Sequence, residues 1–289
     1  MCRNFMPNGA LSSSCLLLLV CCGAAFASPG ASDTAANKTV RAPADISQIV
    51  QESARVTEGD RKASREFDWS ETDLESDGSH KTYRVHMLFG SPYRELIAVN
   101  DRPLPPDERQ EQERKFKNEI SRREHETEGE HASRVAEFEK EQNRDRRFIE
   151  EFVRAFNFKL LRTAVVDGRA VYVVQATPRA GYRPSDRDSQ VLTGMRGELW
   201  IDKTTYQWVK AEAEVVHPVA IAGFVATVEP GTRFVLEKTP VIGNVWLAKH
   251  FSMNEKAEIF SFISHKKHED VAFFDYHRTA YPDTSRKHD

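Results

Sequence analysis

The chain has 289 residues, and its 41 Lys and Arg against 44 Asp and Glu leave a formal net charge of -3. This near balance gives no basic footprint, so we expect no nucleic-acid partner. The length is ample for one large domain with its own hydrophobic core.

Residues 1–27 have the pattern of a secretory signal peptide. Arg3 precedes the apolar run "CLLLLVCCGAAFA", which is too short to span a bilayer comfortably, and the small-x-small pattern ends at Ala27. We therefore predict cleavage after Ala27 and export to the periplasm. Two alternatives stay open: an uncleaved anchor, and a membrane lipoprotein acylated on Cys22, because Leu19-Val20-Cys21-Cys22 resembles a lipobox.

Every cysteine lies inside this segment, at Cys2, Cys15, Cys21 and Cys22. The mature protein would then have no disulfide and no thiol. This excludes cysteine proteases, thiol redox proteins and Cys-ligated zinc. Residues 28–43 are small and polar, and we predict a flexible leader there.

The domain is predicted to span residues 44–280, followed by a tail at 281–289, and to begin with one amphipathic helix. Pro43 and Asp45 form a start signal, and an apolar stripe at i, i+3 and i+4 predicts a helix to about Arg61. Alternation then predicts strands in "REFDWSETDLE", "HKTYRVHMLF" and "YRELIAVN", separated by turns at 77–79 and 90–92.

Residues 105–156 are predicted to be a charged helical insertion. More than half of residues 105–147 carry charge, and Glu and Lys or Arg recur at three- and four-residue spacing, which favours a solvated helix. Phe148, Phe152 and Phe156 belong to an apolar stripe that would dock its end. One rod, a hairpin or partial disorder all fit residues 105–147.

From Asn157 onward the pattern is an almost unbroken series of strands. Asp167-Gly168 is a strong hairpin signal, and the turns that follow are short. Strands joined in this way run antiparallel, and a sheet of about ten strands curls. We predict an α+β fold, mostly β, in which helices close a curved antiparallel sheet or incomplete β-barrel. Its later strands are expected at 197–202, 206–216, 219–228, 232–238, 245–251, 258–264 and 271–278.

Two stretches carry a family resemblance. One is the run L-W-I-D-x-x-T-x-x-x-V-K, formed by Leu199, Trp200, Ile201, Asp202, Thr205, Val209 and Lys210. The other is "FGSPYRELIAVNDRPLPPDERQEQERK", in which Asn100-Asp101 replaces the Asn-Gly of related secreted bacterial proteins. The chain resembles the periplasmic lipoprotein-carrier superfamily of the LolA/LolB type. That resemblance implies a half-barrel groove that holds a lipid or lipoprotein acyl chain.

The expected groove is lined by apolar residues of consecutive strands. Small residues at 220, 222, 223 and 226 favour some unfilled space beneath the covering helices. A groove for an acyl chain needs only apolar lining, because each buried methylene contributes about 0.8 kcal/mol. The candidate ligand-binding residues are Leu199, Ile201, Val209, Phe224, Phe234, Leu236, Trp246, Phe260 and Phe262.

No residue is predicted to be catalytic, and no metal or cofactor is predicted. His265 and His268, followed by Glu269 and Asp270, form the best metal candidate. Two histidines three apart in a strand do not share a face, and no third ligand is indicated. Three hypotheses remain: an apolar-ligand or lipoprotein-binding carrier, an interaction or sensor module that binds an envelope protein through the charged helix, and an enzyme that uses these histidines.

Overall fold

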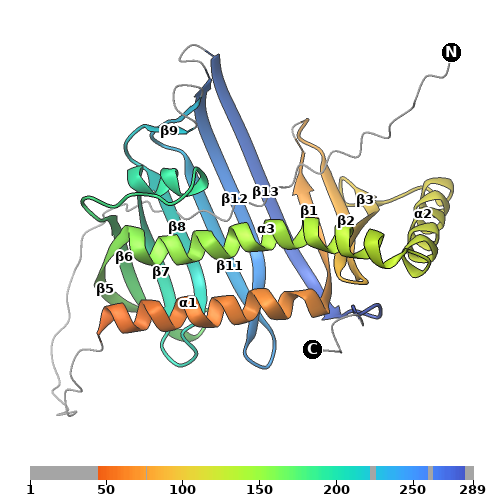
Figure 1. Ribbon diagram of the computed structural model, residues 1–289, viewed down its shortest axis with the longest axis horizontal. Coiled ribbons are helices and arrows are strands. Elements are labelled where there is room, and N and C mark those ends of the chain that lie inside the picture. The colour runs from red at the N-terminus through yellow and green to blue at the C-terminus, as the bar shows by residue number, and fades with distance from the viewer. Residues whose placement is uncertain (1–44, 76, 222–225, 260–262, 284–289) are drawn as a thin grey trace.

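The computed structural model describes residues 45–75, 77–221, 226–259 and 263–283 (Figure 1). The predicted signal peptide and leader lie outside these residues. The described chain forms one open, curved antiparallel sheet, and two long helices cross one face of it. The predicted α+β class is confirmed.

The described sheet contains 13 strands, and all pairs of neighbouring strands in it are antiparallel. Its order is β4-β3-β2-β1-β13-β12-β11-β8-β7-β6-β5, with the short strands β9 and β10 beside β12. The bounds are β1 Phe67–Leu74, β2 His80–Leu88, β3 Ser91–Val99, β4 Arg102–Pro103, β5 Phe156–Val166, β6 Arg169–Pro178, β7 Met195–Asp202, β8 Trp208–Val215, β9 Val219–Ile221, β10 Ala226–Val228, β11 Arg233–Ile242, β12 Val245–Ile259 and β13 Ile263–Arg278.

Two of the predicted strand divisions are wrong. The segment 219–228 is two short strands, because β9 and β10 pair with each other antiparallel. The predicted strands 245–251, 258–264 and 271–278 are two long ones, since β12 and β13 pair from His250 with Ala272 to Ile259 with Ile263. The charged residues between them do not interrupt the strands, because the ladder satisfies the backbone groups whatever the side chains are.

The helix predicted from Asp45 is α1, Ile46–Ala63, with the Asp45 side chain accepting a hydrogen bond from the backbone N–H of Ser47. A short 3-10 helix, η1 at Ser64–Glu66, leads from α1 into β1. A second 3-10 helix, η2 at Asp188–Gly194, precedes β7. In Figure 1, α1 runs along the lower part of the sheet.

The charged insertion forms two helices, α2 Pro106–Glu124 and α3 Glu128–Ala155. Thr127 caps α3 in a capping box with Glu130, so the chain turns there and Gly129 lies within the first turn of α3. Figure 1 shows α3 crossing the sheet antiparallel to α1, and the two helices are in contact. Docking of α3 therefore extends further along its length than the stripe at its end predicts, with Val135 buried as well.

The main hydrophobic core lies between the sheet and the helices. Ile49 and Val50 of α1 and Phe148 and Phe152 of α3 pack there against the buried side chains of β6, β7, β8, β11 and β12. Alternation along β6 places Val173 on the opposite face from Val174, in a smaller buried cluster.

Candidate functional site

A cavity of about 200 Å³ lies between α1, α3 and the strands β8, β11 and β12. Most of its wall is aromatic or aliphatic. The apolar lining residues are Phe148, Ile149, Phe152, Trp208, Leu236, Trp246, Leu247 and Ala248.

The spacing of buried residues along α1 explains why this helix forms one wall of the cavity. On α1 the buried positions Ile49, Val50, Ser53, Thr57 and Asp60 recur at one, three or four residues, so one face points at the sheet. Trp208 of β8 is held against this face, because its indole Nε1 donates a hydrogen bond to Ser53 Oγ at 3.1 Å.

The wall formed by α3 is aromatic. The rings of Phe152 and Trp208 have centroids 5.9 Å apart at 64°, an edge-on contact, and Phe152 lies 5.0 Å from Phe156. Such pairs stabilise the interior beyond the area they bury. They hold the end of α3 at the edge of the cavity.

The inner end of the cavity is polar. Lys238 Nζ lies 2.5 Å from Asp60 Oδ2, and each side chain is 6% exposed. Asp60 Oδ1 also accepts from Gln207 Nε2 at 3.0 Å and from the Trp246 backbone N–H at 2.9 Å. Burial lowers the pKa of Lys238, while the attraction of Asp60 opposes that shift. These bonds join α1 to β11 and to the start of β12.

Among the residues that line the cavity, more exposed charged ones mark its mouth. Arg144 Nε and Asp188 Oδ2 form an ion pair of 2.9 Å, and their side chains are 35% and 43% exposed. Arg61 pairs with Glu58 at 2.7 Å. Asp145 lies at the same rim, where burial raises its pKa to about 7. The cavity thus combines an apolar middle with a charged rim and a neutralised polar inner end.

The structure places the predicted groove residues in different parts of the molecule, and only some of them line the cavity. Leu236 and Trp246 line the cavity. Leu199, Ile201 and Phe234 are buried in the main core against the covering side chains, so their role as ligand contacts stays a prediction. Phe224, Phe260 and Phe262 lie outside the described residues.

Val209 belongs to the second buried cluster, with Trp246, Val171 and Val173. The pairing of β7 with β8 passes from Trp200–Lys210 to Ile201–Trp208, so Val209 is the extra residue of a β-bulge. The bulge gives the position opposite Ile201 to Trp208. A strict alternation of faces from Val209 to Val215 does not predict that Trp208 takes this position in place of Val209.

Sequence reasoning did not identify Thr57, Asp60, Trp208 and Lys238 as parts of one site. Asp60 carried a usable signal, because it falls on the apolar face of a predicted amphipathic helix, where a carboxylate needs a partner. Lys238 carried none, because its partner is far away in the sequence.

Part of the metal candidate lies outside the described side chains. His265 and His268 both lie in β13, and the side chain of His265 is not among those that the structure describes. His268 is exposed, and its Nδ1 is 2.7 Å from Asn254 Oδ1. Among the described residues no group of three or more metal-ligating side chains occurs.

Comparisons with known proteins found similarity only among solved structures: no family model and no curated protein matches the chain. A LolA superfamily protein from Nitrosomonas europaea is 12% identical, with a TM-score of 0.31, over 82% of this chain and 94% of that one. A DUF1329 family protein from Desulfovibrio piger is 11% identical, with a TM-score of 0.27, over 81% and 92%. The MucA/MucB complex from Pseudomonas aeruginosa matches at 12% identity and a TM-score of 0.23, over 82% and 100%.

One of these solved structures is of the LolA type, which the sequence also resembles. The TM-scores of these structures are below 0.5, so the function proposed below depends on the cavity and its residues. Within the described residues, no helix combines the length and the apolar character that crossing a membrane requires.

Proposed function

We propose that this protein is a cell-envelope binding protein that holds an apolar ligand, such as a lipid acyl chain, in the cavity between α1, α3 and the sheet. The observation that carries the proposal is a space of about 200 Å³ with aromatic and aliphatic walls that the protein's own side chains leave open. An apolar cavity of about 150 Å³ is enough to stay dry and bind benzene in another protein.

The energetics support an acyl chain without a dedicated polar motif. Each methylene that leaves water contributes about 0.8 kcal/mol, so several methylenes offset the cost of association. The ligand would contact Leu236 and Trp246 in the middle of the cavity, and the rest of a longer molecule would leave past Arg144 and Asp188 at the mouth. Leu199, Ile201, Val209, Phe234 and the predicted residues outside the described chain remain candidates for a larger opening.

The cellular setting is part of the same proposal. A signal peptide cleaved after Ala27 would deliver the protein to the periplasm. In the alternative, cleavage before Cys22 and acylation of that residue would tether the protein to a membrane there. The lipid moiety of a lipoprotein is then one available ligand. The exposed, charged surface of α2 is the proposed contact for an envelope protein partner.

Native mass spectrometry of the mature protein, followed by organic extraction, tests the proposal directly. We expect masses above that of the polypeptide and a lipid in the extract. A mass equal to the bare polypeptide, together with no uptake of added methyl decanoate, would contradict ligand binding and favour the interaction module.

A cavity-filling variant makes the test specific to this site. Ala248 lines the cavity and is only partly buried, so Ala248→Leu should occupy part of the space. We expect the affinity for methyl decanoate to fall about tenfold or more, roughly 1.4 kcal/mol, with the fold retained. Fluorescence of Trp208 and Trp246, which line the same space, reports the binding.

The matched control is Ala170→Leu, at an exposed position of β6. It adds the same side chain away from the cavity, and its affinity for methyl decanoate should equal that of the wild type. Equal affinities for all three proteins would place the ligand elsewhere.

A further inference from the structure

The inner end of the cavity has hydrogen-bond donors that the protein does not use fully. An ammonium carries three N–H groups, and within the described residues Lys238 Nζ has one hydrogen-bond partner, Asp60. The Thr57 hydroxyl is buried and has no hydrogen-bond partner in the same part of the chain. Thr57 and Lys238 both line the cavity.

Asp60 has little remaining capacity to serve these donors. Its Oδ1 accepts two hydrogen bonds, from Gln207 and from the backbone of Trp246, and its Oδ2 accepts from Lys238 at 2.5 Å. Thr57 lies three residues before Asp60, on the same buried face of α1. The inner end therefore presents O–H and N–H groups to whatever enters the cavity, and their complement is an acceptor.

Charge decides what kind of acceptor fits. Lys238 and Asp60 neutralise each other, and both are almost fully buried. A carboxylate placed beside this pair would be a third buried charge without a countercharge, which is costly. The nearest further cations that line the cavity, Arg61 and Arg144, are paired with Glu58 and Asp188. A neutral carbonyl oxygen meets the same donors without that cost.

We propose that Thr57 and the Lys238–Asp60 pair form a polar subsite for the carbonyl group of an ester- or amide-linked acyl chain. The chain itself lies along Phe152, Leu236 and Trp246. This inference rests on the proposed apolar-ligand function and narrows it to acylated molecules, as opposed to free fatty acids or hydrocarbons.

The test compares three probes of equal chain length, namely methyl decanoate, sodium decanoate and decane, with the wild type and Thr57→Val. Valine keeps the shape of threonine and removes only the hydroxyl. We expect Thr57→Val to weaken methyl decanoate about five- to tenfold, the value of one hydrogen bond, and to leave decane unchanged. At neutral pH the wild type should bind sodium decanoate more weakly than the ester.

Infrared spectroscopy supplies a readout that a structural role of Thr57 would not move. The carbonyl stretch of bound methyl decanoate should lie at lower frequency in the wild type than in Thr57→Val, because the hydrogen bond weakens the C=O bond. Thr163→Val, at an exposed position of β5, is the matched control and should behave as the wild type.

The outcomes separate the two proposals. If all probes bind but Thr57→Val changes neither the affinity for the ester nor its carbonyl frequency, the subsite is wrong and the apolar-ligand function stands. The same result is expected if the Thr57 hydroxyl binds only a water molecule. Tighter binding of decanoate than of the ester would likewise overturn the subsite. If no probe binds, the proposed function itself fails.

Discussion

Buried polar side chains are concentrated where elements are fastened together, and Asp60 is the clearest case. One carboxylate on α1 receives hydrogen bonds from β11, from the start of β12 and from Gln207, just before β8. Removal of one partner from such a pair leaves an uncompensated buried charge. The pair therefore determines how α1 lies on the sheet, and with it one wall of the cavity.

We predict that Asp60→Leu lowers the free energy of unfolding by about 3–5 kcal/mol, because Lys238 is left buried without its countercharge. The double variant Asp60→Leu with Lys238→Met should recover part of that loss. The hydrogen bonds that Gln207 and the Trp246 N–H donate to Asp60 would still be lost and should prevent full recovery. Urea denaturation measures both.

The control for this pair is an exposed one, Glu52 with Arg55, on the solvent side of α1. Glu52→Leu should change the unfolding curve little, since exposed ion pairs contribute little. If Asp60→Leu behaved in the same way, the buried pair would not anchor α1.

A second cluster of buried polar side chains surrounds His86 of β2. Its Nε2 is 3.1 Å from Glu95 Oε2 and its Nδ1 is 3.6 Å from Asp68 Oδ2, while the ring stacks on Phe116 of α2 with centroids 4.1 Å apart. Burial by itself lowers the pKa of His86, but the two carboxylates outweigh it and the pKa is raised. The neighbouring charges are Arg84, 3.8 Å from Glu95, and His277, 3.8 Å from Asp68.

The raised pKa gives a pH-dependent prediction. The stabilisation from protonated His86 is fully present below the unfolded pKa of about 6.5 and is lost as pH rises through the higher folded pKa. Between pH of about 6 and about 9, the wild type should therefore lose more unfolding free energy than His86→Gln. The exposed variant His80→Gln should follow the wild type, and parallel curves for His86→Gln and the wild type would contradict the prediction.

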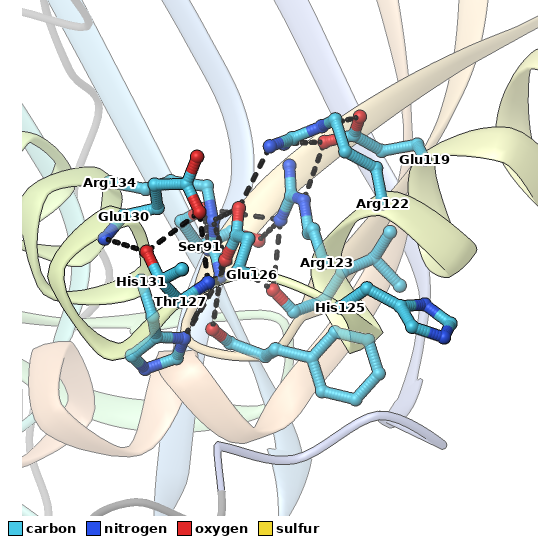
Figure 2. Close-up of polar contacts among 12 residues, drawn as sticks. Ser91, Glu119, Arg122, Arg123, His125, Glu126, Thr127, Glu130, His131 and Arg134 are labelled. Carbon is cyan, nitrogen blue, oxygen red and sulfur yellow. Dashed lines mark hydrogen bonds and ion pairs between the residues drawn. The ribbon is translucent and has the colours of Figure 1, made fainter.

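At the scale of elements, arginines of α2 and α3 attach the turn between these two helices to the β2–β3 turn. Figure 2 shows Arg122, Arg123 and Arg134 around Glu119, Glu126 and Ser91. Arg123 Nη1 donates to the carbonyl oxygens of Leu88 and Ser91, both at 2.8 Å. Thr127 caps α3 directly after α2 ends. The arginine contacts therefore set the direction in which α2 leaves the sheet.

Adjacent arginines provide a matched pair of variants. Arg123 is buried and donates to backbone carbonyls, so Arg123→Met should cost about 1–3 kcal/mol of local stability by removing these hydrogen bonds. Arg122 is half-exposed and pairs only with Glu119 and Glu126 among the described residues, so Arg122→Met should have a much smaller effect. Amide hydrogen exchange in α2 should quicken for Arg123→Met alone; equal exchange in both variants would mean that the turn is held by other contacts.

At the scale of the molecule, the two ends of the domain meet in the sheet. β1 pairs with β13, from Phe67 with Arg278 to Asp73 with Val271, so the first strands continue the sheet that the last strand would otherwise end. This pairing covers a long edge of β13. Together α1 and α3 then cross one continuous surface, and the cavity is what remains between them and the strands.

The sequence by itself determined the local structure: the start of α1 at Asp45, the hairpin at Asp167-Gly168, the alternation around Leu199 and Ile201, and the α+β class. These depend on turn chemistry and side-chain periodicity, which act over a few residues. The sequence also predicts an apolar space under the helices, and Leu236 and Trp246 do line a cavity there. Ligand binding by these residues stays a prediction.

Only the tertiary structure decided which residues surround that space. A β-bulge exchanged Val209 for Trp208, α3 covered part of the expected groove, and Lys238 met Asp60 across 178 residues of chain. Each outcome depends on how distant elements pack and register, and the free energies that select among such arrangements arise from contacts that no local pattern encodes.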